Sequence, residues 1–316
     1  MRHTFTSTLV ELARRDSRIV LLTGDLGYQV LEPFATEFPD RFFNVGVAEQ
    51  NMVGLATGLA EGGVIPFVYS IVSFAVLRPL EFIRNGPILH RLPVRIVGVG
   101  GGFDYGMNGI SHYGLEDVAV LRAQPGISII APADHQQARR ALEATWDAAG
   151  CVYYRLGREE KTVVENLDGR FEPGRLAIVR EGQDLALITT GAIATEVAAA
   201  AATLGTLGVS CTVAIVASIS PPPVSDIAAL LERFTVAMTV EAHSTVGGLG
   251  SLVSEIAAER DVRCRIVRCG IRLPLDGLVG SPEYLHARHG LSRDALVHQA
   301  LHECGRRRDA RSVTQP

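Results

Sequence analysis

RFFNVGVAEQNMVGLATGLAEGGVIPFVYS (41–70) decides the fold, because it holds a strand, a helix and a second strand in that order. FFNVGV and VIPFVYS are short, continuous apolar runs, typical of strands covered on both faces. Between them, residues 48–62 carry apolar side chains at helical spacing. This order predicts a crossover unit and therefore a parallel sheet.

The same alternation extends along the whole chain. Further helical patterns occupy 73–90 and 135–149. The other predicted strands of the first half are IVLLTGD (19–25), VRIVGVGG (94–101), ISIIAPAD (127–134) and CVYYRLG (151–157). Those of the second half are LALITTG (185–191), VSCTVAIVAS (209–218), VAMTVEA (236–242) and RCRIVRCG (263–270).

We therefore predict an α/β protein with two doubly wound domains and mainly parallel sheets. The first domain spans 1–157 and the second 184–304. Residues 158–183 are charged and hold Gly and Pro, which predicts a linker. The polar segment 305–316 is expected to be a disordered tail.

Composition excludes several classes of protein. The chain has 316 residues, with 30 Lys+Arg and 34 Asp+Glu, so its net charge is −4. That balance argues against a nucleic-acid or membrane-surface binder. Lys161 is the only lysine and sits in a polar stretch, which disfavours a pyridoxal enzyme, and no P-loop motif occurs.

The cysteines and the N-terminus indicate a cytoplasmic protein. Five cysteines form no CxxC motif, and three of them lie in apolar runs, which predicts buried thiols in a reducing compartment without disulfides or a metal site. The first residues, MRHTFTSTLVELARRD, contain no apolar signal segment. We expect no membrane span, and partners that are small molecules and protein.

Polar residues that follow strands are the candidates for chemistry, because ligands of open α/β sheets bind at the carboxyl ends of the strands. Glu49 directly follows a strand and opens a helix. It is either a first-turn glutamate favoured by the helix dipole or a partly buried acid in a cleft, and spacing alone favours the first.

Each of three further segments has two open interpretations. The Gly-rich loop 98–117 is either a surface loop or a ligand-binding loop with His112 as the proton-transfer candidate. Tyr69 and Phe74 are either core aromatics or a platform for a flat ligand. Glu241 and His243 precede a Gly-rich helix start, which is either an anion site or a tight structural turn.

Taken together, the motifs resemble the C-terminal half of a transketolase, and in particular the two-subunit transketolases that split this thiamine-diphosphate enzyme into two chains. The segments that carry the resemblance run in family order: LLTGDL (21–26), FPDRFFNVGVAEQNMVGLATGLAEGG (38–63), PFVYSIVSFAVLRPLEFIRN (66–85), LPVRIVGVGGGFDYGMNGISHYGLEDVAVLRAQPGISIIAPAD (92–134), YYRLGR (153–158) and VEAHSTVGGLGS (240–251).

The resemblance implies the domains, the cofactor and the partner. The first domain would bind the pyrimidine of thiamine diphosphate, and the second would be the transketolase C-terminal domain. The family's Gly-Asp-Gly…Asn motif, which holds Mg²⁺ and the diphosphate, is missing here. We therefore expect a sister subunit to supply that motif and the Mg²⁺, as an α2β2 heterotetramer.

The resemblance also implies roles for cofactor-binding and catalytic residues. Glu49 would hydrogen-bond a ring nitrogen of the aminopyrimidine, so that a ketose donor is cleaved and its two-carbon ketol unit passes through an enamine to an aldose acceptor. Phe74 and Tyr69 would stack on the pyrimidine. Asp25 and Leu26 would lie near the thiazolium ring. His112, in Gly-Ile-Ser-His in place of the family's Gly-Pro-Thr-His, would contact the reacting oxygens.

The substrate residues depart from the family pattern. Asn108 stands where many transketolases have an aspartate that binds the donor. Arg2 and Arg155 match the two arginines that hold a substrate phosphate, the second loosely because Arg158 is near. The family's serine is replaced by Gln29, and its histidine has no counterpart. The incomplete set predicts an acceptor that lacks phosphate or a specialised pathway.

Three rival functions remain open at the sequence level. The first is the beta subunit of a 2-oxo acid dehydrogenase, and the second an enzyme like deoxyxylulose-phosphate synthase. The third is a non-catalytic regulatory or scaffold subunit. The presence of Glu49, Phe74 and His112 argues against the last, because a scaffold would not need them.

Overall fold

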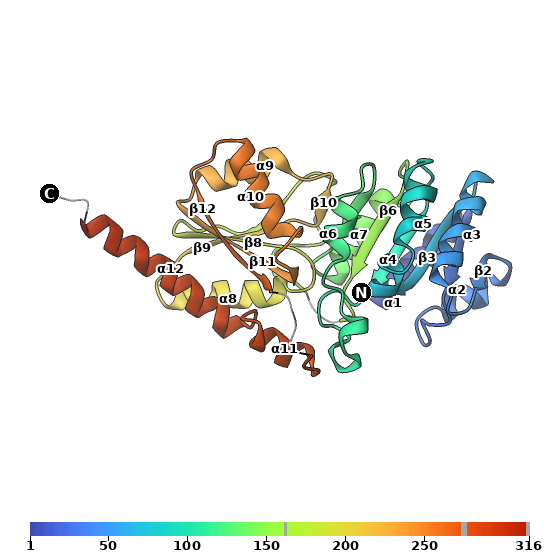
Figure 1. Ribbon diagram of the computed structural model, residues 1–316, viewed down its shortest axis with the longest axis horizontal. Coiled ribbons are helices and arrows are strands. Elements are labelled where there is room, and N and C mark those ends of the chain that lie inside the picture. Colours follow the sequence, from blue (N-terminus) through green and yellow to red (C-terminus); the bar gives the residue numbers. More distant parts are fainter. Residues whose placement is uncertain (161–162, 273–276, 314–316) are drawn as a thin grey trace.

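The computed structural model describes residues 1–160, 163–272 and 277–313, with side chains as far as residue 305. Two α/β domains lie next to each other along the long axis of the molecule (Figure 1). Lys161, the sole lysine of the sequence, lies outside the described residues. None of the described helices is both long and apolar enough to cross a membrane.

The first sheet has seven strands in the order β10-β5-β6-β4-β3-β1-β2. Its strands from the first half of the chain all pair in parallel. They are β1 (Ile19–Thr23), β2 (Phe42–Asn44), β3 (Ile65–Ile71), β4 (Arg95–Val99), β5 (Ser128–Ile130) and β6 (Val152–Leu156). The interior strands β1, β4 and β6 are buried along their whole length, as their continuous apolar runs predict.

Helices cover both faces of this sheet (Figure 1). One face packs against α1 (Arg2–Arg15), α2 (Glu32–Glu37) and α7 (His135–Thr145). The other packs against α3 (Glu49–Glu61), α4 (Val72–Val76), α5 (Leu80–Ile83) and α6 (Asp117–Arg122). Four short turns of helix connect them: η1 (Pro39–Arg41), η2 (Arg84–Ile88), η3 (Gly106–Asn108) and η4 (Ile110–His112).

The predicted helix over 73–90 is divided into three pieces, α4, α5 and η2. Pro79 precedes α5 and Pro87 lies inside η2. Proline lacks a backbone N–H and restricts the residue before it, so a regular helix does not continue through either position.

The second sheet has five strands in the order β12-β11-β8-β9-β7, parallel except for the β7–β9 pair. The strands are β7 (Ala177–Arg180), β8 (Leu185–Thr189), β9 (Cys211–Ile215), β11 (Val236–Ser244) and β12 (Arg265–Ile271). One face packs against α8 (Ala194–Thr206), α11 (Pro282–Arg288) and α12 (Arg293–Val313), and the other against α9 (Val224–Glu232) and α10 (Leu249–Glu259). The predicted fold class, two mainly parallel α/β domains, is therefore confirmed.

The boundary between the domains differs from the predicted linker. Strand β7 lies inside the range 158–183 and forms the edge of the second sheet. The predicted strand 209–218 ends at Ile215, and β10 (Ser218–Ser220) pairs antiparallel with β5 in the first sheet. Local pattern does not show which sheet a three-residue edge strand joins, because that depends on tertiary placement.

The predicted disordered tail is also different in the structure. Helix α12 continues to Val313, and only 314–316 of the predicted tail lie outside the described residues. Apart from Gly305, the segment from 305 to 313 contains no strong helix breaker and is rich in arginine. A single glycine costs a helix only about 1 kcal/mol, which does not force it to end.

Candidate active site

Glu49 is a buried carboxylate at the first position of α3, and its side chain is 2% exposed. Oε1 accepts a hydrogen bond from Ser70 Oγ at 3.3 Å, and Oε2 accepts one from Arg78 Nη1 at 2.9 Å. A carboxylate away from water needs such partners, because an unpaired buried charge is very costly. Of the two interpretations left open by the sequence, the structure favours the buried acid.

Arg78 connects this carboxylate to Phe74, and Phe74 in turn contacts His112, although the two residues are far from Glu49 in the sequence. The Arg78 guanidinium carbon lies 3.7 Å from the centre of the Phe74 ring. The imidazole of His112 meets Phe74 edge to face, with 4.9 Å between ring centroids. Ser73 Oγ donates to the Ser111 carbonyl at 2.9 Å, which fixes α4 against the turn that carries His112. Three of the predicted residues therefore form one contiguous group with Arg78.

Asp25 and Leu26 lie in the turn that follows β1. Asp25 has a φ of +57°, and its Oδ1 accepts hydrogen bonds from Asn44 Nδ2 and the Tyr28 hydroxyl, both at 3.0 Å. These bonds, first that of Asn44, lower the pKa of the exposed Asp25 carboxyl. Gly24 packs against Glu49, since a Cβ built there would lie 3.4 Å from Oε1. The turn is thus placed next to the buried acid.

Tyr69 is not brought to Glu49. It is 2% exposed and stacks on Phe5 of α1, with 5.7 Å between ring centroids. Its neighbour Ser70 bonds Glu49 on the opposite face of the sheet, as expected because successive residues of a strand point to opposite faces. Burial raises the pKa of the Tyr69 hydroxyl, so it stays neutral. The structure therefore places Tyr69 in the core.

All the predicted substrate residues except His112 line one cavity between the domains, with a volume of about 660 Å³. Arg2, Asn108 and Arg155 all contribute to its wall, together with Arg158. Residues 191–193 of the second domain also line the cavity. The cavity thus collects side chains that the sequence separates by more than 150 positions.

Arg155 is more strongly engaged than a free substrate ligand would be. It is 6% exposed, and its Nε donates to Asp117 Oδ2 at 2.8 Å. Nη2 donates to the carbonyls of Gly114 and Ala242, at 2.7 and 3.0 Å. Arg2, by contrast, has a buried Nε without a hydrogen-bond partner in the described part of the chain. Of the two predicted phosphate ligands, Arg155 therefore has most of its donors engaged within the protein, whereas Arg2 Nε has none of these bonds.

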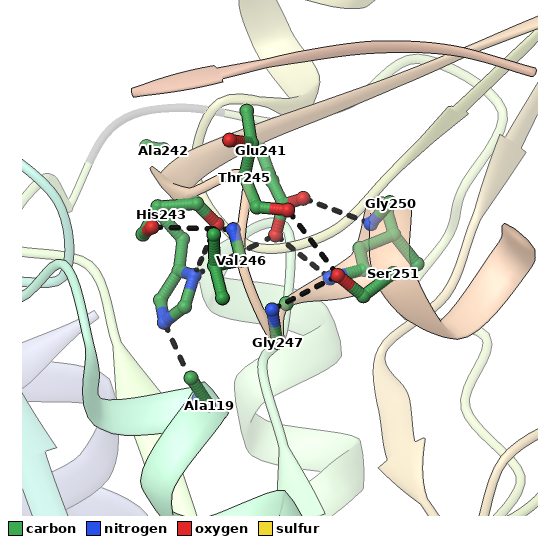
Figure 2. A network of polar contacts seen from close by, with 12 residues as sticks. Ala119, Glu241, Ala242, His243, Thr245, Val246, Gly247, Gly250 and Ser251 are labelled. Carbon is green, nitrogen blue, oxygen red and sulfur yellow. Dashed lines mark hydrogen bonds and ion pairs between the residues drawn. The ribbon is translucent and has the colours of Figure 1, made fainter. Parts of the chain in front are cut away.

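Glu241 and His243 form a structural turn instead of an open anion site (Figure 2). The Glu241 carboxylate accepts the N–H groups of Leu249 and Gly250, at 2.7 and 2.8 Å, and so occupies the N-terminus of α10 itself. His243 Nε2 accepts the N–H of Ala119 in the first domain at 3.4 Å. Burial lowers the pKa of His243 to about 4, so this contact between the domains uses the neutral ring.

Three polar residues of the site were not predicted from the sequence. Arg78 lies between α4 and α5 in a stretch that reads as an amphipathic helix, where an arginine is an ordinary surface residue. Asp117 opens α6 and pairs with Arg155, but it looks like any first-turn acid. The third is Ser70. The alternation of side chains along β3 could have indicated it, because Ser70 points to the face of the sheet opposite to that of its neighbour, the core residue Tyr69.

Family models match both halves of the chain. The transketolase pyrimidine-binding domain matches residues 1–162, and the transketolase C-terminal domain matches residues 174–296. The chain belongs to the transketolase family. The predicted family resemblance is therefore confirmed.

Relatives of similar length carry the names of parts of divided transketolases. A putative transketolase C-terminal section of Methanocaldococcus jannaschii is 36% identical over 306 residues, which are 96% of each chain. One of the subunits of the apulose-4-phosphate transketolase of Phocaeicola vulgatus is 37% identical over 303 residues, covering 95% of this chain and 96% of that protein. A split-gene transketolase solved as an inactive beta4 tetramer superposes with a TM-score of 0.84 at 34% identity, covering 95% and 96% of the two chains.

The residues around Glu49 fit the pyrimidine end of the thiamine diphosphate that transketolases use. A buried carboxylate supplies a hydrogen-bonding group for the edge of a flat heterocycle, and the neighbouring Phe74 ring supplies an apolar face. The planar Arg78 guanidinium already uses both in this structure, so a flat, polar-edged group can be held there.

Proposed function

We propose that this chain is the pyrimidine-binding subunit of a heteromeric transketolase, which transfers a two-carbon ketol unit from a ketose donor to an aldose acceptor. The observation that carries the proposal is the buried Glu49 carboxylate grouped with Phe74 and His112. Relatives of the same length that are named as transketolase subunits support it.

Each residue of the group has a distinct task in this proposal. Thiamine diphosphate, when bound, supplies the nucleophilic carbon and the electron sink for cleaving and forming a carbon–carbon bond. Glu49 Oε2 would share a proton with the ring edge of the cofactor, in a site where burial strengthens the bond. Phe74 would orient the ring by its face. The partly buried His112 would hydrogen-bond the substrate oxygens.

The proposal requires a second chain. The sequence has no Gly-Asp-Gly…Asn motif for Mg²⁺ and diphosphate, so we propose that a sister subunit supplies both, in an α2β2 assembly. The apolar side chains exposed around Glu49 are consistent with a covering partner: Tyr28, Phe43, Val47, Leu77 and Phe82 are each 39% to 72% exposed.

The test is reconstitution of this chain with a co-purifying chain that carries the missing motif. We expect ketol transfer from a ketose to an aldose by the complex with Mg²⁺ and thiamine diphosphate, and none by either chain alone. Synthesis of deoxyxylulose phosphate from pyruvate and glyceraldehyde phosphate, or oxidation of a 2-oxo acid, would assign the rival enzymes instead. A complex that holds cofactor but performs none of these reactions would indicate a non-catalytic subunit.

A further inference from the structure

Arg78 makes, at the same time, the two contacts that the proposed cofactor ring requires. Its Nη1 donates to Glu49 Oε2 at 2.9 Å, and its guanidinium carbon lies 3.7 Å from the centre of the Phe74 ring. A guanidinium is planar, has hydrogen-bond donors along its edge and stacks on aromatic faces. An aminopyrimidine has the same flat shape and the same division between polar edge and flat face.

The Arg78 guanidinium and an aminopyrimidine ring would compete for the same atoms of Glu49 and Phe74. Glu49 Oε1 already accepts the bond from Ser70 Oγ, and Arg78 uses Oε2. The imidazole of His112 contacts Phe74 as well, with its ring tilted by 67°. A ring that bonded Glu49 Oε2 along the same direction and stacked on the same face of Phe74 would displace Arg78 from both contacts.

The exposed fractions of the two side chains show that Arg78, and not Glu49, is the one that can move away. The Arg78 side chain is 43% exposed, whereas that of Glu49 is 2% exposed. Arg78 also lies in the short connection between α4 and α5, next to Pro79, and not within a continuous helix. Water can solvate the guanidinium as it moves outward, while the carboxylate stays anchored by Ser70.

We propose that Arg78 is a placeholder for the cofactor ring: it pairs with Glu49 and covers Phe74 in the subunit without cofactor, and it moves out when the pyrimidine enters. This inference rests on the proposed function. Arg78 then acts as a positioning residue, because it keeps the buried acid paired and oriented before assembly, and each binding event must first break its contacts.

The test is the affinity of the reconstituted complex for thiamine diphosphate, measured by calorimetry with Mg²⁺ present. Arg78→Met keeps much of the length of the side chain but removes the charge and the planar face. A partly exposed ion pair and a cation–π contact together correspond to a gain of about three- to tenfold in cofactor affinity when they no longer compete. Arg84→Met is the matched control, since Arg84 is exposed and bonds only Asn85 among its described contacts.

A second probe needs no partner chain. The free pyrimidine 4-amino-5-hydroxymethyl-2-methylpyrimidine, titrated into the isolated full chain, should bind more tightly to Arg78→Met than to the wild type or Arg84→Met. If Arg78→Met fails to fold, Arg78→Lys takes its place, because a lysine can pair with Glu49 but has no planar face; it should raise affinity by a smaller factor.

Unchanged or weaker binding by the Arg78 variants would overturn the inference, and weaker binding would assign Arg78 to the cofactor-loaded site. The proposed function is judged separately, from ketol transfer by the wild-type complex. If the wild type transfers ketol units while the Arg78 variants bind like it, the function stands and the placeholder role does not. If no variant and no wild-type complex binds the cofactor, the proposed function itself is wrong.

Discussion

A buried acid whose ion pair is a weak source of stability is a candidate for a chemical role, and Glu49 is such a residue. Replacing a buried ion pair by apolar groups is often neutral or stabilising, so the pair it forms with Arg78 is a weak reason for its presence. Its position at the start of α3 gives it some stabilisation from the helix dipole, but an exposed acid would gain that too. We therefore propose that a ligand uses this carboxylate.

At this scale we predict that Glu49→Gln abolishes nearly all ketol transfer by the reconstituted complex, by at least about a hundredfold in kcat, because an amide cannot share the proton with the cofactor. The fold should persist, since Gln fills the same space and still accepts from Ser70. Turnover and thermal melting are measured together. Glu61→Gln, at the exposed end of the same helix, is the control and should keep full activity; near-normal turnover in Glu49→Gln would refute the assignment.

The sequence predicts some of the residues around Glu49 and misses others. Glu49, Phe74 and His112 are connected through Arg78 at one edge of the sheet, where the ends of parallel strands meet, and their roles stay predictions. Tyr69 was assigned beside them, but the alternation of β3 sends it into the core with Phe5. Arg78 was missed, since nothing in a surface-like arginine shows that it folds back onto an acid 29 residues away.

At the scale of elements, the N-terminus of α10 shows how a helix end can be satisfied without a ligand. Glu241 on β11 accepts two N–H groups that the helix leaves without intrahelical partners. Gly248 is required there, because a Cβ would lie 1.9 Å from Glu241 Oε2. Figure 2 shows this cap beside His243, which reaches Ala119 in the other domain.

This cap predicts opposing pH dependences of stability. Burial raises the pKa of Glu241 from 4.5 to about 7, so the folded chain holds this proton more tightly than the unfolded chain, and stability falls as pH rises between those values. Burial lowers the pKa of His243 from 6.5 to about 4, so its contribution rises with pH over that window. In the wild type the two largely offset each other between pH 4.5 and 6.5.

Replacing either Glu241 or His243 should therefore reveal the pH dependence of stability that the other residue contributes. In Glu241→Gln, stability should rise from pH 4.5 to 6.5, and in His243→Gln it should fall from pH 4.5 to 7, each by at most about 3 kcal/mol. Urea unfolding midpoints at half-unit pH steps measure this. Asp117, whose Oδ1 lies 4.0 Å from His243 Nε2, stays unchanged in both variants. Parallel pH profiles for the wild type and both variants would contradict the prediction.

On the scale of the whole molecule, the two domains are joined more closely than a linker implies. Strand β10 leaves the second domain to complete the first sheet, and α9 and α10 share an apolar cluster with α3 and α6. Arg155 bonds Asp117 in one domain and Ala242 in the other. The sequence predicted both domains from their strand and helix periods, but these long-range pairings depend on tertiary contacts that no local pattern encodes.

The contacts of Arg155 that join the two domains also determine what the cavity between them can hold. Arg155 uses Nε and Nη2 on Asp117 and two carbonyls, so only its Nη1 remains for a phosphate. The family resemblance implies that Gln29 replaces a serine of the phosphate site. Arg2 has an unpartnered Nε among the described atoms. A single arginine binds phosphate more weakly than two arginines that act together with neutral hydrogen-bond donors.

We therefore predict that the reconstituted enzyme uses an unphosphorylated aldose with a kcat/KM at least equal to that for the corresponding phosphorylated aldose, assayed with one donor and at one ionic strength. Arg2→Met should lower kcat/KM for the phosphorylated acceptor by about tenfold, one charge-assisted hydrogen bond, and leave the unphosphorylated acceptor within about a factor of two. A preference of more than about tenfold for the phosphorylated acceptor in the wild type would show that Arg155 or Arg158 completes the phosphate site, because the described residues of the cavity wall include no further arginine.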